Sequence, residues 1–325
     1  MNFLGAFMTS VASVFTILLM MALGYLLTSL GWFDENFSGS LSKLIMNVAL
    51  PANIFMSVMS NLTVNKLVSL SSGLIYSFAA VIIGYVIAYL VVKIARIRPG
   101  RRGVFMNMVV NANTIFVGLP LNLALFGSKS MPYFLVYYVT NTVSTWAFGV
   151  FLISNDDPTK QKGQKAETKF NWKKLLPAPL LGFIVALLWL FLKLPVPNWA
   201  GNTLNYVGSL VTPLSLIYIG IVLHNAGLKS IKFDRDTLLG LIGRFIVTPA
   251  IMVCLILLGS HLGHGLPSME MQTLVVQAAA PALAVMPILA NEAHGDVEYA
   301  TNLVTTSTVL FIVVVPIVMT LIQFI

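Results

Sequence analysis

The chain has 325 residues, of which 58% are hydrophobic and 9% are charged, with a mean hydropathy of +0.89 and a net charge of +8. Soluble domains carry about 25% charged residues, so these values exclude an ordinary soluble domain and predict a polytopic membrane protein. The positive charge does not indicate nucleic-acid binding, because the basic residues stand in short loops between apolar spans.

Ten apolar segments are each long enough to cross a bilayer as a helix, which takes about 20 residues. We therefore predict an all-α polytopic membrane protein. No basic region or cleavage site marks a removable signal peptide, so we expect the first segment to be the first span. The predicted spans are 9–30, 39–60, 67–92, 103–127, 131–153, 175–194, 201–223, 236–259, 270–291 and 296–322.

The basic loops predict the orientation of these spans. The loops after spans three, five and seven carry many lysines and arginines, whereas the opposite side carries only Lys66, Lys129 and Lys193. Basic loops of membrane proteins face the cytoplasm. We therefore expect a multi-pass protein of the plasma membrane with both termini outside.

The fourth span is interrupted by polar residues and by proline. Its sequence from Val109 to Gly127 is V-V-N-A-N-T-I-F-V-G-L-P-L-N-L-A-L-F-G. Each unpaired polar group at membrane depth costs several kcal/mol, and proline removes a backbone donor. We predict that the helix breaks near Gly118, Leu119 and Pro120, and that the freed backbone faces a cavity lined by protein.

The ninth span repeats this pattern. Gln277, Pro281 and Pro287 interrupt the apolar segment between Val275 and Asn291. Two interrupted helices in corresponding positions of two halves are the best sequence indication of a binding site in a transporter.

Three pairings indicate that the halves arose by duplication: Pro51 with Pro213, Pro120 with Pro281, and the run from Tyr138 to Thr145 with the run from Tyr299 to Thr306. Their offsets are 162, 161 and 161 residues, and the two runs are identical at five of eight positions. Five spans per repeat force the second repeat to insert upside down. The sequence thus predicts two inverted repeats, 1–153 and 175–325, joined by a cytoplasmic linker at 154–174.

The polar residues beside the proline positions are the candidates for a binding site. Asn113 approaches the predicted break from within the first half-helix, so we expect it to line the cavity. Asn47 and Gln277 each stand four residues before a proline and are weaker candidates.

Span five carries a polar face formed by Asn141, Ser144, Thr145 and Phe148 at helical spacing, and span ten repeats it with Asn302, Thr305, Thr306 and Val309. We expect both faces to point to the interior of the bundle. Asn141 either contacts substrate or makes interhelical hydrogen bonds, and for Asn302 we favour interhelical hydrogen bonds.

Charged residues are nearly absent from the span interiors. No Asp or Glu falls in the middle of a span, which argues against a proton or sodium relay. Arg244 is expected to snorkel or to form a structural pair, although it is also placed to cap a broken helix or to meet an anion. The positive N-termini of broken helices suit a carboxylate, so we expect an organic anion as substrate.

No motif predicts catalysis. His261 and His264 stand in an outer loop without further ligands, Cys254 is interpreted as a packing residue, and nucleophile–base pairs and phosphate-binding loops are missing. We therefore predict no enzyme, no catalytic residue, no metal and no cofactor. An intramembrane enzyme and a non-transporting sensor are alternatives, but the sequence shows neither a reactive set of residues nor an output domain.

Four runs of residues resemble the auxin efflux carrier family, which includes plant auxin exporters and bacterial organic-acid permeases, and the likeness covers nearly the whole chain. They are N-V-A-L-P at Asn47–Pro51, N-T-I-F-V-G-L-P-L at Asn113–Leu121, R-F-I-V-T-P-A at Arg244–Ala250 and V-Q-A-A-A-P at Val276–Pro281.

The resemblance implies ten helices in two inverted repeats, with broken helices four and nine crossing at the centre, and an elevator motion of the remaining spans against spans one, two, six and seven. It places Asn113 and the crossover at Pro120 and Pro281 at the core of the substrate site, with Leu50 and Pro51 facing it. It also suggests a homodimer.

The chain departs from the plant pattern in span five, where Tyr137, Asn141 and Thr142 stand in place of glutamine-rich positions. We therefore predict a secondary transporter of a small carboxylate such as malate or malonate. The alternative is an exporter or uniporter of an amphipathic aromatic acid such as auxin, which aromatic side chains in the pocket would favour.

Overall fold

The computed structural model describes residues 3–63, 70–159, 177–227 and 231–322; the side chains of residues 3–14 and 35 are outside that description. Within these ranges the secondary-structure elements are helices, which confirms the all-α prediction. Most of the predicted linker, and the first residues of predicted spans three and six, lie outside the described residues.

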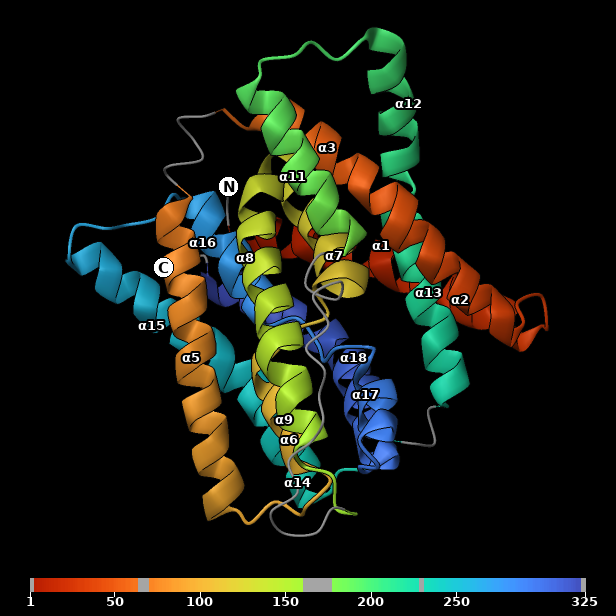
Figure 1. The fold of residues 1–325 in the computed structure, drawn as a ribbon, viewed down its shortest axis with the longest axis vertical. Coiled ribbons are helices and arrows are strands. Elements are labelled where there is room, and N and C mark those ends of the chain that lie inside the picture. Colours follow the sequence, from red (N-terminus) through yellow and green to blue (C-terminus); the bar gives the residue numbers. More distant parts are fainter. Residues whose placement is uncertain (1–2, 64–69, 160–176, 228–230, 323–325) are drawn as a thin grey trace.

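The packing divides the helices into two groups (Figure 1). In the first group α1 packs along α13, and α3 packs against α11 and α12. The members of this first group are α1 (Phe3–Ser29), α2 (Glu35–Leu44), η1 (Ile45–Ala49), α3 (Leu50–Asn61), α11 (Ala178–Phe191), α12 (Asn198–Ser209) and α13 (Val211–Ala226).

The second group contains the two interrupted segments. In it α5 packs against α6, α8 and α15, and α18 packs against α17. Its members are α5 (Ser71–Ile94), α6 (Arg102–Val110), η2 (Thr114–Gly118), α7 (Leu119–Phe126), η3 (Ser128–Ser130), α8 (Met131–Val143), η4 (Ser144–Gly149), α9 (Val150–Ser154), α14 (Arg235–Ile242), η6 (Gly243–Val247), α15 (Thr248–His261), α16 (Ser268–Ala278), α17 (Met286–Glu292) and α18 (Val297–Leu321).

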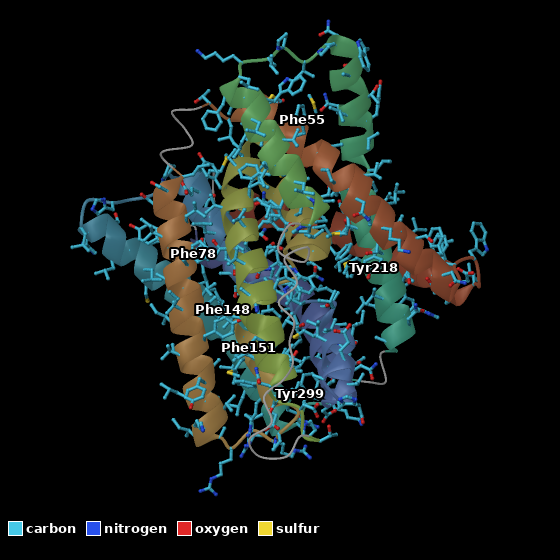
Figure 2. The ribbon with its side chains drawn as sticks, in the orientation of Figure 1. Phe55, Phe78, Phe148, Phe151, Tyr218 and Tyr299 are labelled. Atoms are coloured by element: carbon cyan, nitrogen blue, oxygen red, sulfur yellow. The ribbon has the colours of Figure 1, made fainter. Side chains whose placement is uncertain are left out.

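Within the described residues, six helical segments are long and apolar enough to cross a membrane: Asn36–Asn61, Ser71–Ile94, Ser128–Ser154, Asn198–Ala226, Arg235–His261 and Val297–Leu321. Their outer surface is apolar. Phe148 and Phe151, for example, are 59% and 52% exposed and stand on the outside of the bundle (Figure 2). Such a surface is stable against lipid and costly against water, so the protein is embedded in a membrane as a multi-pass bundle.

Wide π-helical turns precede three of the prolines. The turns η1, η2 and η6 end two residues before Pro51, Pro120 and Pro249, respectively. Proline lacks an N–H, and its ring collides with the carbonyl group four residues earlier in a regular α-helix. A π turn is wider because its hydrogen bonds span five residues, so it accommodates the ring without ending the helix. These prolines therefore mark wide turns, and the chain continues as a helix through each of them.

Small residues bring α1 and α13 into close contact. A Cβ atom on Gly24 would overlap the backbone of Ile217, and one on Gly220 would overlap the carbonyl oxygen of Met21. Such contacts between backbones drive helix association in membranes, where lipid removes most of the hydrophobic driving force. They make this pair the central contact of the first group.

An ionic cluster joins the loops at one end of the second group, the end at which α6 and α14 begin. Arg101 contacts Asp234 at 2.7 Å and Asp296 at 2.6 Å, and its guanidinium lies 4.5 Å from the ring of Tyr299 (Figure 2). Burial alone would raise the pKa of Asp234, but hydrogen bonds from Thr237 and Arg101 bring it below its usual value. The cluster holds the starts of α6, α14 and α18 together.

Candidate functional site

Two interrupted helices meet at the centre of the second group. The segment from α6 to α7 leaves helical geometry at residues 111–113, and the segment from α16 to α17 does so at residues 279–285. They enter the centre from opposite ends of the bundle (Figure 1) and pair as an antiparallel bridge between Ala112 and Ala282. The amide of Asn113 also donates to the carbonyl oxygen of Pro281 at 2.8 Å. Each break thus provides hydrogen-bond partners for part of the other's backbone.

The first break is located seven residues before the predicted position. Pro120 lies inside a continuous helical stretch, because the wide turn η2 accommodates it. The backbone opens instead at Ala112, where the side chain of Asn141 replaces both helical partners. Asn141 Nδ2 donates to the carbonyl of Ala112 at 2.9 Å, and its Oδ1 accepts from the amide of Ala112 at 2.8 Å. An amide side chain can match a peptide group in this way, so Asn141 fixes the first break.

The second break is held by a buried arginine and a serine. Arg244 is fully buried and donates to the carbonyl oxygens of Val109, Ala278 and Ala280, at 3.2, 2.8 and 2.6 Å. These groups lie at the C-terminal ends of α6 and α16, where the helix dipoles are negative and carbonyls lack helical partners. Ser307 Oγ accepts from the amide of Ala282 at 3.1 Å.

The role of Arg244 therefore differs from the favoured prediction. It neither snorkels nor pairs with a carboxylate, and it caps the ends of both broken helices. The sequence could not select this alternative, because the capped carbonyls belong to segments 34 to 135 residues away.

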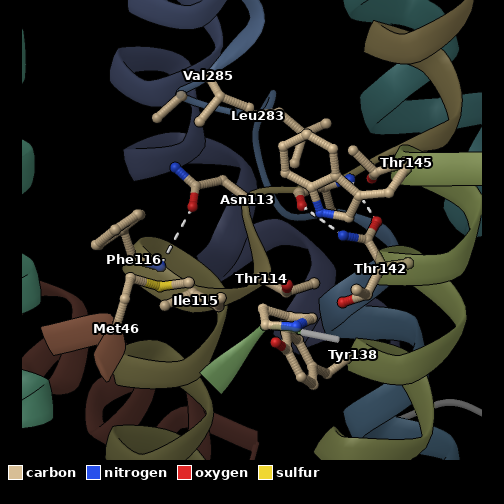
Figure 3. A pocket seen from close by; sticks show the side chains of 15 residues that line it. Met46, Asn113, Thr114, Ile115, Phe116, Tyr138, Thr142, Thr145, Leu283 and Val285 are labelled. Carbon is tan, nitrogen blue, oxygen red and sulfur yellow. Dashed lines mark hydrogen bonds between the residues drawn. The ribbon is translucent and has the colours of Figure 1, made fainter. Parts of the chain in front are cut away.

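A cavity of about 210 Å³ lies against the first break (Figure 3). Thr142 and Thr145 of span five stand on one side, and Leu283 and Val285 of the second break form another wall. Among the residues that the structure describes, none with a charged side chain lines the cavity. The lining consists of Met46, Ala112, Asn113, Thr114, Ile115, Phe116, Tyr138, Asn141, Thr142, Thr145, Trp146, Pro177, Leu283, Ala284 and Val285.

Asn113 presents a free donor to this cavity. Its Oδ1 accepts from the amide of Phe116 at 3.2 Å, as the N-cap of η2. That bond fixes which end of the amide is oxygen, so the nitrogen points away from the cap. Asn113 Nδ2 and Thr145 Oγ1 are both buried and have no hydrogen-bond partner among the residues that the structure describes. Buried polar atoms without a partner are rare in folded proteins, and here both atoms lie in the same cavity.

Comparison with known proteins agrees with this geometry. Residues 9–319 match the family model described as membrane transport protein. The chain belongs to this family, the auxin efflux carriers and their relatives. It is similar to an uncharacterised transporter of Methanothermobacter thermautotrophicus, 24% identical over 317 residues that cover 95% of this chain and 97% of the relative. It is also similar to an uncharacterised transporter of Methanocaldococcus jannaschii, 22% identical over 307 residues, which cover 93% and 95% of the two chains. The protein is therefore a membrane transporter.

Of the residues singled out from the sequence, the structure places Asn113 and Asn141 in the cavity lining of this transporter. Pro281 and Gln277 lie just outside it. The carbonyl of Pro281 binds Asn113, and Gln277 Nε2 donates to the carbonyl of Gly118 at 2.9 Å. Pro120 is buried in α7 beyond the lining.

The remaining candidates lie away from the cavity. Asn47 is exposed and binds only the carbonyl of Lys43 on its own helix. Leu50 is buried in the core, and Pro51 packs against Gly182 of α11. Tyr137 is buried beside Arg244 and does not line the cavity. Met46 lines the cavity in place of Asn47, because the wide turn η1 changes which residues share a helix face.

Most of the lining was missed by sequence reasoning. Tyr138, Thr142 and Thr145 lie on the span-five face that also holds Asn141, so an extension of its helical spacing would have found them. Phe148 was assigned to that face incorrectly, since the π turn η4 rotates it outward to 59% exposure. The apolar residues of the second break carry no sequence signal.

Two further residues change the sequence-based picture. Glu270, the first residue of predicted span nine, is a buried carboxylate, so the lack of such a group no longer argues against a proton or sodium relay. Cys254 is exposed on α15, so it is not a core packing residue.

The pairing of Pro120 with Pro281 is also wrong by position. Pro281 lies in the second break, whereas Pro120 lies inside the continuous helical stretch that follows the first break. Ser307 is the residue of span ten that binds the break. Asn302 makes the interhelical hydrogen bond that was favoured for it, to Thr237 of α14, and also binds the backbone of Lys232.

Proposed function

We propose that this membrane transporter is a secondary carrier for a small organic anion and that the cavity at the crossover is its substrate site. The observation that carries the proposal is the amide nitrogen of Asn113, which has no hydrogen-bond partner among the described residues and lies at a cavity whose described lining is uncharged. A carboxylate oxygen would accept a hydrogen bond from this donor. In a site shielded from water, such a bond to a charged acceptor contributes about 1.5–3 kcal/mol.

The helix ends around the cavity support an anion. The stretch from Thr114 to Phe126 is continuous, and its N-terminus, capped by Asn113, borders the cavity. A helix N-terminus carries about half a positive charge, and a cavity without carboxylates does not offset it. Arg244 already makes three hydrogen bonds to carbonyls, so in this conformation it stabilises the frame of the site and does not bind the substrate.

The two helix groups support transport by alternating access. Met46 and Pro177 come from the first group, and the other lining residues come from the second. Phe116 of the second group also stacks on Tyr218 of the first at 4.4 Å. A site at a boundary of this kind changes its exposure when one group moves against the other. We propose that the second group is the moving part of an elevator and the first group its scaffold.

We extend the proposal to the number and orientation of the membrane crossings. The six long segments, the two broken helices, α1 and α11 account for ten crossings, with residues 1–153 and 175–325 as inverted repeats. With the basic loops in the cytoplasm of a plasma membrane, both termini are outside.

The volume and the side chains of the lining each favour a kind of substrate. The volume of about 210 Å³ is below the usual range of about 300–1,000 Å³ for drug-sized ligands, which favours a small acid such as malate or malonate. Phe116, Tyr138 and Trp146 also line the cavity, which favours an aromatic acid as the second candidate.

Counterflow in proteoliposomes tests the proposal without knowledge of a coupling ion. Vesicles loaded with unlabelled malate are diluted into labelled malate, and malonate, lactate, citrate and indole-3-acetate are added as competitors. We expect transient accumulation of label that one class of acid abolishes. If no acid, labelled in turn, shows counterflow with a folded protein, the organic-anion assignment is wrong.

A further inference from the structure

The first turn of α16 carries a carboxyl group that the proposed site does not use. Glu270 is fully buried, and neither of its carboxyl oxygens has a hydrogen-bond partner among the described residues. A Cβ atom on Gly73 of α5 would overlap Oε1, and it would also contact Val136 of α8. Three helices of the second group thus enclose the carboxyl, and α5 provides the space for it by carrying a glycine.

Charges that would balance an ionised carboxylate are missing around it in the described part of the chain. The titratable groups on the elements packed against α16 near this end are Tyr76 of α5, Lys129 of η3, Tyr133 of α8 and His261 of α15. Tyr133 interacts electrostatically with Glu270, and a phenol supplies no positive charge. An isolated ionised carboxylate in such surroundings is strongly disfavoured, and binding a proton removes the charge.

A line of polar groups leads from this carboxyl toward the crossover. Glu270, Thr273 and Gln277 share one face of α16, and all three side chains are fully buried. Thr273 Oγ1 and Gln277 Oε1 also have no partner, as does the hydroxyl of Ser77, one turn after Gly73 on α5. Gln277 ends the line by binding the carbonyl of Gly118 in η2, the turn whose cap lines the cavity.

We propose that Glu270 is a proton-binding site and that its protonation couples substrate movement to the proton gradient. The carboxyl binds a proton from water before it is buried and keeps it while buried, as in this structure. The proton is released when motion of the second group gives the carboxyl access to water. The coupling rests on the proposed carrier function, whereas the protonation of Glu270 does not.

The first experiment detects the proton directly. Infrared spectra of the purified protein are recorded over a pH series for the wild type, for Glu270→Gln and for the control Glu298→Gln, whose side chain is exposed. We expect the wild type at neutral pH to show the C=O band of a protonated carboxyl, which Glu270→Gln lacks and Glu298→Gln keeps. A wild-type spectrum without such a band contradicts the proposal, and this reading needs no folded variant.

The second experiment measures coupling. Malate is used if it shows counterflow, and otherwise whichever acid does. We expect a proton gradient to drive accumulation by the wild type and by Glu298→Gln. Glu270→Gln should keep counterflow and lose gradient-driven accumulation entirely, because glutamine resembles the protonated carboxyl and cannot release a proton. Wild-type counterflow without any effect of the gradient, or gradient-driven accumulation by Glu270→Gln, overturns the coupling. Absence of wild-type counterflow would instead contradict the carrier function and leave the infrared result standing.

Discussion

The two breaks at the crossover are built differently, although they occupy matching places in their helices. At the first break, Asn141 binds both backbone groups of Ala112, and Asn113 caps the next helix while its nitrogen remains free. At the second break, Arg244 and Ser307 bind the backbone, and the residues that reach the cavity are Leu283, Ala284 and Val285.

This difference separates two tasks. The first break supplies the polar groups of the cavity, and the second supplies an apolar wall together with the charge that stabilises the helix ends. Under the proposed carrier function, one set of oriented polar groups is enough for a small substrate, which leaves the second break free to be apolar. The following predictions test this division by removing one support at a time.

Arg244→Ala has the largest expected effect. It leaves the buried carbonyls of Ala278 and Ala280 without their donor, at about 1–3 kcal/mol for each unsatisfied group, while the carbonyl of Val109 keeps the hydroxyl of Thr248. We expect severe loss of folded protein, measured by fluorescence-detected size exclusion and by thermal unfolding in detergent. Arg244→Lys should retain part of the stability, since it keeps the charge but not the forked geometry. A stable Arg244→Ala protein with normal transport would show that the breaks do not depend on this cap.

Asn141→Ala should have the second largest effect. It removes both hydrogen bonds to Ala112 inside the bundle, which we expect to destabilise the protein by about 2–4 kcal/mol. Thermal unfolding of the purified variant measures the loss. An unchanged unfolding midpoint, with transport lost, would instead identify Asn141 as a residue that binds substrate.

Ser307→Ala removes a single hydrogen bond to the amide of Ala282. We expect a smaller destabilisation of about 1 kcal/mol and nearly normal counterflow, because Ser307 does not line the cavity. An equal loss of stability in Ser307→Ala and Asn141→Ala would show that these side chains hold the two breaks equally strongly, which contradicts the difference described above.

Asn47→Ala should have the smallest effect. The side chain is exposed and bonds only within its own helix, so transport and thermal stability should stay near wild type. A large loss of transport in a stable Asn47→Ala protein would place that residue in the path of the substrate after all.

The sequence predicted the kind of protein and the two interrupted segments, because apolar length and misplaced polar residues are local signals. It placed the first break wrongly at Pro120, since the π turn that accommodates the proline depends on packing and not on composition. The face of span five was correct up to Thr145 and wrong at Phe148 for the same reason.

The supports of the site depend on contacts between distant segments. Arg244 binds residues of two other spans, and the burial of Glu270 follows from α5 carrying Gly73 at the point of contact. Neither contact produces a periodicity or a motif that can be recognised in a single sequence. Asn113 was chosen because it precedes the break predicted at Gly118 to Pro120, and it lies at the break itself because that break falls earlier in the chain; its part in substrate binding stays a prediction.

The most direct test of the substrate site is counterflow by Asn113→Asp. Aspartate caps a helix as well as asparagine does, so the variant keeps the acceptor for the amide of Phe116 and should unfold near the wild-type temperature. It replaces the free donor by a second acceptor and adds a negative charge to the cavity. We predict that counterflow of the organic anion is abolished in a folded Asn113→Asp protein. Counterflow at the wild-type rate would contradict the assignment of this cavity as the anion site.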